Sequence, residues 1–120
     1  MLAVQKTGAL FLRIRAAGRL TAADYRCFER DFARAIERRS RPVQLLLDMR
    51  GFNGWTPAGF VRDLAWDWRN RRSFSRIAVV GDKRWHQWIT IIARPLFRAP
   101  MNFFRDGKKA AAWLRASARS

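Results

Sequence analysis

Residues 76–88 read RIAVVGDKRWHQW, and this stretch decides the fold class. A short β-branched run, 77–80, ends at Gly81, and a tryptophan-rich segment follows at once. A continuous apolar run of this length is typical of a strand that is covered on both faces of its sheet. The pattern therefore predicts a buried strand, a turn and a helix over residues 83–94 that Asp82 caps.

Strands and helices alternate in the same way along the rest of the chain. Thr21 and Asp24 have the spacing of a capping box, and Thr56 and Asp106 are placed to cap two further helices. Residues 50–56 are expected to form a loop. The expected strands are 2–5, 10–16, 43–49, 77–80 and 101–104, and the expected helices are 22–39, 57–72, 83–94 and one after Asp106. The order ββαβαβαβα predicts an α/β fold with four helices and one five-stranded, mixed and mainly parallel sheet, whose first strand is antiparallel at an edge.

Length and composition are those of one domain that spans residues 1–120. The chain has 120 residues, of which 49% are apolar, so it can bury one core. No apolar run approaches the roughly 18 residues of a membrane span, and no basic segment precedes the first apolar pieces. Cys27 is the only cysteine, which excludes an internal disulfide. These features predict a cytoplasmic protein and leave attachment to a membrane surface open.

The charge balance is strongly basic. Lysine and arginine number 25 against nine acidic residues, which gives a formal net charge of +16. Such a surface attracts polyanions or anionic lipid. On the first predicted helix, four arginines spaced by four residues form a basic ridge: Arg26, Arg30, Arg34 and Arg38. The ridge is interpreted as a solvated helix face or as a surface for the nucleic-acid backbone, and motifs that read bases are absent.

Helical periodicity predicts which aromatic side chains reach the core. The side chains expected to pack on the sheet are Phe28, Phe32, Leu64, Trp68, Trp85, Trp88, Ile92 and Trp113. Trp66 and Ile91 fall outside the apolar stripes and among arginines, so both are expected at the surface. With Leu96 and Phe97 they would form an apolar contact surface for a protein partner, a second subunit or an anionic membrane.

A second candidate surface lies where strands end. The carboxyl ends of parallel strands are the usual place for ligands in open α/β sheets, and helix starts there favour anions. The residues expected to gather at this edge are Asp48, Arg50, Trp55, Thr56, Asp82 and Arg84. Glycine-rich phosphate-binding motifs are absent, so the simplest interpretation of residues 76–88 remains a strand, a turn and a capped helix.

Catalytic chemistry has little support in the sequence. Cys27 is expected to be a small core or boundary residue, and His86, the only histidine, is expected at the surface beside Asp82. Neither has the base and orienting group that an activated nucleophile requires. We therefore predict no enzyme, no cofactor and no metal. An enzyme that uses Asp48, Asp82 and His86 is the alternative.

Four groups of residues follow one another along the chain: GRLTAADY at 18–25, LLLD at 45–48 with the later Gly54-Trp55, residues 76–82 with Trp85, and Phe104 followed by residues 110–114. In this order and spacing they resemble the SpoIIAA-like family, which is related to STAS domains and more distantly to CRAL-TRIO lipid-binding domains. The resemblance implies a small mixed sheet with helices, no known enzymatic activity, and roles in signalling contacts or in binding apolar ligands near membranes.

One position departs from the pattern of the STAS-type antagonists of anti-sigma factors. These relatives carry a phosphorylatable serine at the start of the helix after the third strand, where this chain has Thr56 as its only hydroxyl. A cap is the simpler role for Thr56, and phosphorylation is the alternative. The predicted function is a non-enzymatic regulatory or binding module that acts through protein contacts or an apolar, lipid-like ligand, at an anionic membrane surface in one version. The alternative is charge-driven, non-specific binding of nucleic acid.

Overall fold

The structure is a computed structural model that describes residues 1–5, 11–37 and 42–119, with side chains up to residue 116. The predicted strand start at Leu10 and the predicted helix end at 38–39 lie outside the described residues. The strands are β1 (Leu2–Gln5), β2 (Leu12–Ala16), β3 (Gly18–Leu20), β4 (Val43–Asp48), β5 (Phe52–Trp55), β6 (Phe74–Val80) and β7 (Met101–Phe104). The helices are α1 (Ala22–Glu37), α2 (Pro57–Asn70), α3 (Arg84–Ala93) and α4 (Gly107–Arg119), with a short 3₁₀ turn at Arg94–Leu96.

The main sheet has five strands in the order β1-β2-β4-β6-β7. The edge strand β1 runs antiparallel to β2, and the other three pairs are parallel. Ile14, Leu47 and Val79 lie side by side across the three central strands. The predicted α/β fold, with its mixed and mainly parallel sheet, is confirmed.

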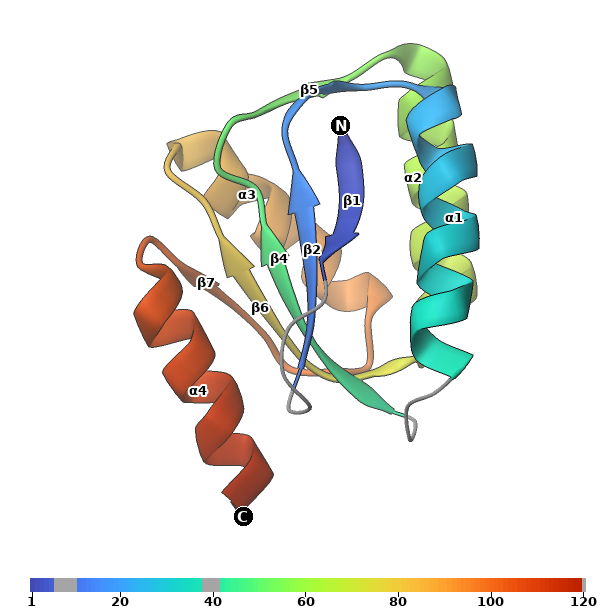
Figure 1. Cartoon of the computed structure of the whole chain (residues 1–120). Coiled ribbons are helices and arrows are strands. Elements are labelled where there is room, and N and C mark those ends of the chain that lie inside the picture. Colours follow the sequence, from blue (N-terminus) through green and yellow to red (C-terminus); the bar gives the residue numbers. More distant parts are fainter. Residues whose placement is uncertain (6–10, 38–41, 120) are drawn as a thin grey trace.

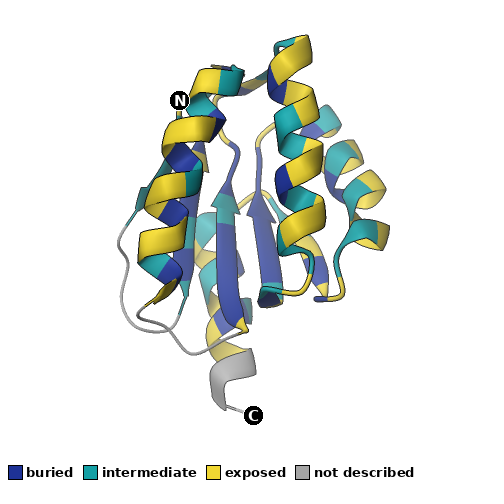
Figure 2. Ribbon diagram, turned by 90° about the vertical axis from the view of Figure 1, so that its right-hand side faces the viewer, coloured by how far each residue is buried: buried dark blue, intermediate teal, exposed yellow. Residues whose placement is uncertain are grey.

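Helices cover the two faces of this sheet unequally (Figure 1). Helices α1, α2 and α3 lie over one face, where the larger core cluster contains Phe28, Phe32, Ile14 and Ile77. Helix α4 alone lies over the other face, where Leu114 packs on the central strands in a smaller cluster. Figure 2 shows the buried strands behind helices whose outer surfaces are exposed.

A second, two-stranded sheet was not predicted. Strand β3 pairs in parallel with β5. Strand β5 lies inside the segment 50–56 that was expected to be a loop. Both strands are short and contain a glycine with positive φ, 67° at Gly18 and 111° at Gly54. Because such glycines usually mark turns, the sequence pattern favours turns at both places. The pairing of the two strands is seen only in the tertiary structure.

Three of the four predicted helix caps are confirmed. The Thr21 hydroxyl accepts a hydrogen bond from the Asp24 N–H, and the Asp24 carboxylate accepts one from the Thr21 N–H. The Thr56 hydroxyl accepts from the N–H of the residue three positions later, and Asp106 accepts from the Lys108 N–H. The fourth prediction is wrong, because α3 begins after Lys83 and has no side-chain cap.

The predicted phase of α2 and α3 is wrong. Phe28 and Phe32 are buried as expected, and Trp85 and Trp113 are half-buried. Four other predicted core side chains are exposed: Leu64 by 44%, Trp68 by 57%, Trp88 by 64% and Ile92 by 71%. The prediction assumed that the most apolar stripe of each helix faces the sheet, and here that stripe faces away from it.

Three further predictions of burial are wrong, and two of them follow from the same error in the phase of α2 and α3. Trp66, expected at the surface, is buried against Phe28 and Phe32 at ring-centroid distances of 5.2 and 5.1 Å. His86, also expected at the surface, has an exposed fraction of 0%. Cys27, expected in the core or at its boundary, is exposed, because it lies outside the buried stripe of α1 that contains Phe28 and Phe32. Ile91 is exposed, as predicted.

None of the helices that the structure describes has the length and apolar character needed to cross a membrane.

Candidate functional site

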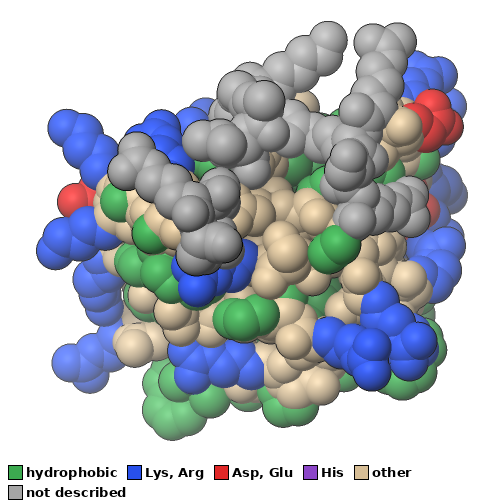
Figure 3. Space-filling view, turned by 90° about the horizontal axis from the view of Figure 1, so that it is seen from below, with side chains coloured by type: hydrophobic (Ala, Val, Ile, Leu, Met, Phe, Trp, Pro, Cys, Tyr) green, Lys and Arg blue, Asp and Glu red, His purple; other side chains and the backbone are tan. Residues whose placement is uncertain are grey.

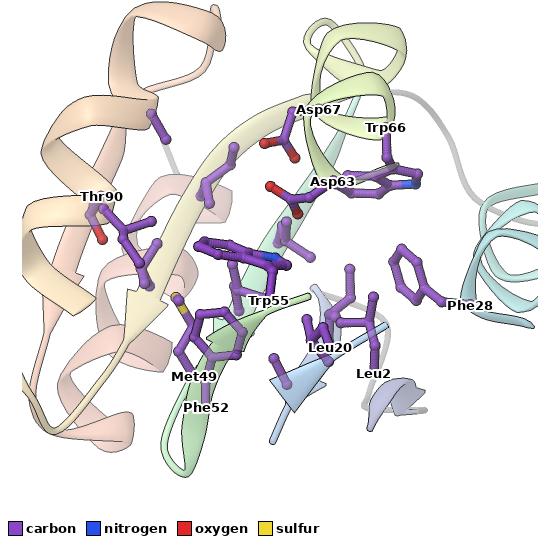
Figure 4. A pocket seen from close by; sticks show the side chains of 18 of the residues that line it. Leu2, Leu20, Phe28, Met49, Phe52, Trp55, Asp63, Trp66, Asp67 and Thr90 are labelled. Carbon is purple, nitrogen blue, oxygen red and sulfur yellow. The ribbon is translucent and has the colours of Figure 1, made fainter. Parts of the chain in front are cut away.

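A cavity lies between the sheet and the inner faces of α1, α2 and α3, and Figure 4 shows it from close by. Its volume is about 100 Å³. Apolar residues of the sheet, among them Leu45, Leu47 and Ile77, line it together with Trp55 and many other apolar side chains. A mostly apolar cavity with a few polar groups is the usual form of a small-molecule site.

The polar groups of the cavity form one connected chain. The Trp55 indole N–H donates a hydrogen bond of 2.8 Å to the Tyr25 hydroxyl, which itself donates one of 2.7 Å to Asp63 Oδ1. Asp63 also hydrogen bonds with Asp67, one helical turn further along α2. In Figure 4 both carboxyl groups extend from α2 toward the cavity, above the Trp55 ring.

Burial changes the protonation of these groups. It raises the pKa of Asp63, and burial together with the charge and the hydrogen bond of Asp63 raises the pKa of Asp67 to about 9. Burial and the neighbouring carboxylate of Asp63 also raise the pKa of Tyr25, so its hydroxyl keeps its proton and remains a donor. Two carboxyl groups in contact cannot both ionise easily, so this pair retains a proton at neutral pH.

No cation balances the carboxyl pair within the part of the chain that is described. The arginines on the other side of α2, Arg62 and Arg69, both pair with Glu29 of α1. None of the ion pairs of the described residues includes Asp63 or Asp67. Two of the nine acidic residues of this basic chain thus lie together in an apolar cavity.

Only some of the residues predicted to gather at the carboxyl ends of the strands lie together there. Asp48 accepts two hydrogen bonds from the Arg50 guanidinium, at 3.0 and 2.9 Å. Burial acts to raise the pKa of Asp48, but the hydrogen bonds and the charge of Arg50 outweigh it and hold that pKa below its usual value. The charges of Asp82 and Asp106 also act on Arg50. Arg50 is therefore already paired.

The remaining predicted residues divide between the cavity and the surface. Trp55, Trp66 and Phe97 line the cavity, although Trp55 was expected at the strand edge and the other two at an exposed contact surface. Thr56 uses its hydroxyl within the fold, accepting from a backbone N–H and donating to Leu20 O at 3.4 Å. The remaining two lie elsewhere: Arg84 is exposed and Leu96 is half-buried.

His86 has a structural role. Its Nδ1 accepts a hydrogen bond of 3.3 Å from the Asp82 N–H, and its Nε2 lies 3.0 Å from the carbonyl oxygen of Phe52, to which it donates in the corresponding tautomer. The ring thus ties the start of α3 to β5. A Cβ atom added to Gly81 would lie 2.7 Å from the His86 Cβ, which shows how closely the turn is packed.

The basic ridge of α1 is exposed at the three positions that the structure describes, Arg26, Arg30 and Arg34. Arg38 lies outside the described residues. Figure 3, a view from below, shows lysine and arginine side chains around the margin of the molecule and few acidic ones. Binding of nucleic acid or another polyanion by this surface stays a prediction.

Sequence reasoning missed the carboxyl pair and Tyr25 as site residues. Neither Asp63 nor Asp67 was singled out in the sequence, where acidic side chains on a helix are usually expected to face solvent. Their spacing of four residues was the available signal. Like charges one turn apart destabilise a helix, and the chain has few acidic residues.

Comparisons with known proteins agree with this architecture. A protein of the DUF3478 family from Shewanella loihica PV-4, described as uncharacterized and as having a SpoIIAA-like fold, superimposes with a TM-score of 0.82 at 23% identity; the match covers 95% of this chain and 92% of that one. The anti-sigma factor antagonist SpoIIAA in its unphosphorylated form superimposes with a TM-score of 0.65 at 12% identity, over 96% of this chain and 98% of that one. No curated protein sequence matches. The SpoIIAA-like family profile matches residues 11–115, so this chain belongs to the SpoIIAA-like family.

Proposed function

We propose that this chain is a non-enzymatic regulatory module that acts by binding a protein partner through the outer surfaces of α2 and α3. The observation that carries this proposal is the exposure of seven large apolar side chains on these two helices. We call them the α2–α3 face: Phe60, Val61, Leu64, Trp68, Trp88, Ile91 and Ile92.

The orientation of α2 makes this surface unusual. An amphipathic helix normally turns its apolar stripe toward the core. Here Leu64 and Trp68 face outward, while Asp63 and Asp67 line the cavity. Exposed apolar patches mark interaction sites, and tryptophan is enriched among the residues that dominate binding energy. The apolar stripe of α2 is therefore available for a partner.

Membership of the SpoIIAA-like family supports a regulatory role. The solved relative SpoIIAA is an anti-sigma factor antagonist, a role that is exercised through another protein. The burial of His86, which was considered for catalysis, also supports binding over chemistry. Its ring is hydrogen bonded within the fold.

Exposed arginines lie at the ends of the two helices that carry the α2–α3 face, and they favour an acidic partner. Arg72 follows α2, Arg84 begins α3 and Arg94 follows α3, and all three are exposed. Complementary charge of this kind accelerates association and selects partners more than it adds affinity.

The proposal is tested by affinity capture from the source cells with quantitative mass spectrometry. A partner captured by the wild type should be lost with the double variant Trp68→Ala/Trp88→Ala and retained with Arg30→Ala on α1. Equal capture by both variants would exclude this face. Sedimentation of the purified protein shows whether the partner is a second copy, because the double variant would then dissociate a dimer.

A second candidate function, attachment to an anionic membrane, is favoured by one contact. The Arg71 guanidinium lies 3.9 Å from the centroid of the exposed Trp68 ring. Tryptophan at the headgroup level with arginine beside it is typical of proteins that lie on membranes. Vesicles of phosphatidylcholine, with and without phosphatidylserine, test this candidate. Binding should require phosphatidylserine and should weaken with salt, and equal binding to both vesicles would contradict it.

A further inference from the structure

The cavity beneath α2 holds acidic groups that the proposed protein contact does not use. Asp63 and Asp67 line it together with apolar side chains from the sheet and all three overlying helices. Their polar contacts are internal, with Tyr25 and with each other. Removing a carboxylate from water without a cationic partner costs free energy. The burial of Asp63 and Asp67 is therefore unfavourable, and a cationic ligand would reduce its cost.

The side chains that line the cavity indicate which kind of ligand would stabilise the two acidic groups. Aromatic rings of Phe28, Trp55 and Trp66 line the cavity near the acidic groups. Tyr25 also lines the cavity and is hydrogen bonded to Asp63. Aromatic rings attract cations over their faces, and aromatic walls with carboxylates are a known chemistry for organic ammonium groups. A carboxylate ligand would instead meet like charge.

The size of the cavity limits the ligand. A volume of about 100 Å³ is of the same order as the roughly 150 Å³ cavity of another protein that takes up benzene. The cavity therefore suits one small ring or a short aliphatic chain.

We propose that the cavity is a binding site for a small organic ammonium compound, whose charged nitrogen contacts Asp63 and Asp67 and whose apolar part lies against Trp55 and the sheet. The ammonium group replaces the proton that the pair holds, so binding releases a proton to the solvent. Its affinity therefore rises with pH over the range in which the ligand stays charged. This site is separate from the α2–α3 face, so each proposal can fail alone.

Benzylamine and benzyl alcohol are the matched probes, because they have nearly the same shape and differ in charge at neutral pH. Calorimetry and NMR titration of the full chain should show roughly tenfold tighter binding of benzylamine, as expected for a charge-assisted contact. The shifted resonances should include those of Tyr25, Trp55 and Thr90, which line the cavity. The proton release should appear as a dependence of the measured heat on the ionisation enthalpy of the buffer.

Variants of nearly identical shape complete the test. Asp67→Asn should reduce the affinity for benzylamine by roughly tenfold and leave benzyl alcohol unchanged. Asp63→Asn, which keeps an acceptor for Tyr25, should act in the same direction. Asp31→Asn, on the exposed surface of α1, is the control and should change neither affinity. Equal affinity for the two probes, no binding of benzylamine, or an unchanged affinity in both cavity variants would overturn the proposal.

Discussion

Tyr25 of α1 and Asp63 of α2 are joined by a hydrogen bond of 2.7 Å, in which the tyrosine hydroxyl donates. The same hydroxyl accepts from the Trp55 indole N–H. One side chain thus connects α1, α2 and β5 at the wall of the cavity. Its position depends on the pairing of β3 with β5, which sets the starts of α1 and α2 beside each other.

The Tyr25→Phe variant should be less stable than the wild type. It keeps the ring but leaves the Asp63 carboxyl and the Trp55 N–H without their partner, at a cost of about 1–3 kcal/mol. Urea unfolding followed by tryptophan fluorescence measures the loss. Arg84→Ala, an exposed change on α3, is the control and should stay within about 0.5 kcal/mol. A Tyr25→Phe variant as stable as this control would show that the hydroxyl is not needed for folding.

The carboxyl pair should make the protein less stable as pH rises. The pKa of Asp67 increases from 3.8 to about 9 on folding, so the folded state binds more protons than the unfolded chain between these values. Stability then falls with increasing pH across that window. Thermal unfolding at several pH values should show a smaller decline for Asp67→Asn than for the wild type. Parallel curves for the two proteins would contradict the shifted pKa.

Gly59 and Gly107 offer a matched pair of substitutions in helices. A Cβ at Gly59 would lie 2.3 Å from Leu20 O, whereas one at Gly107 would meet only Arg50 Nη2 at 3.9 Å. Gly59→Ala should therefore cost about 1–3 kcal/mol through overpacking, and Gly107→Ala should be neutral or slightly stabilising. Chemical denaturation of both variants tests the close approach of α2 to β3. Equal stability of the two would argue against it.

His86→Ala should destabilise the protein, because the ring is fully buried and hydrogen bonded at both nitrogens. The lost volume and the unpaired Phe52 carbonyl together cost about 2–4 kcal/mol. Differential scanning calorimetry should show a clear drop in Tm. A variant with the Tm of the wild type would mean that His86 has some role other than holding α3 to β5.

Local signals in the sequence predicted the parts of the fold that local interactions decide. The apolar run 77–80 indicates a strand, and Thr21 and Thr56 indicate helix starts, through interactions among residues that are close in the sequence. The strands, the helix starts and the fold class could therefore be predicted. The phase of α2 could not, because its inner side holds Asp63 and Asp67. Their presence there depends on Tyr25, a partner 38 residues from Asp63 in the sequence.

The candidate site was unpredictable for a related reason. Trp55 was expected at the strand edge, and the hydrogen bond from its indole to Tyr25 depends on a strand pair that contains two glycines of positive φ. The pattern of apolar and polar residues does not predict such a contact. It indicates which side chains are buried, but not which polar groups form hydrogen bonds with each other.

The ladder between β3 and β5 has a mechanical consequence. Leu20 pairs with Trp55, and the residues that follow them, Thr21 and Thr56, begin α1 and α2. The starts of α1 and α2 are thus held together through one short pair of strands, so a displacement at this end of one helix should be transmitted to the other.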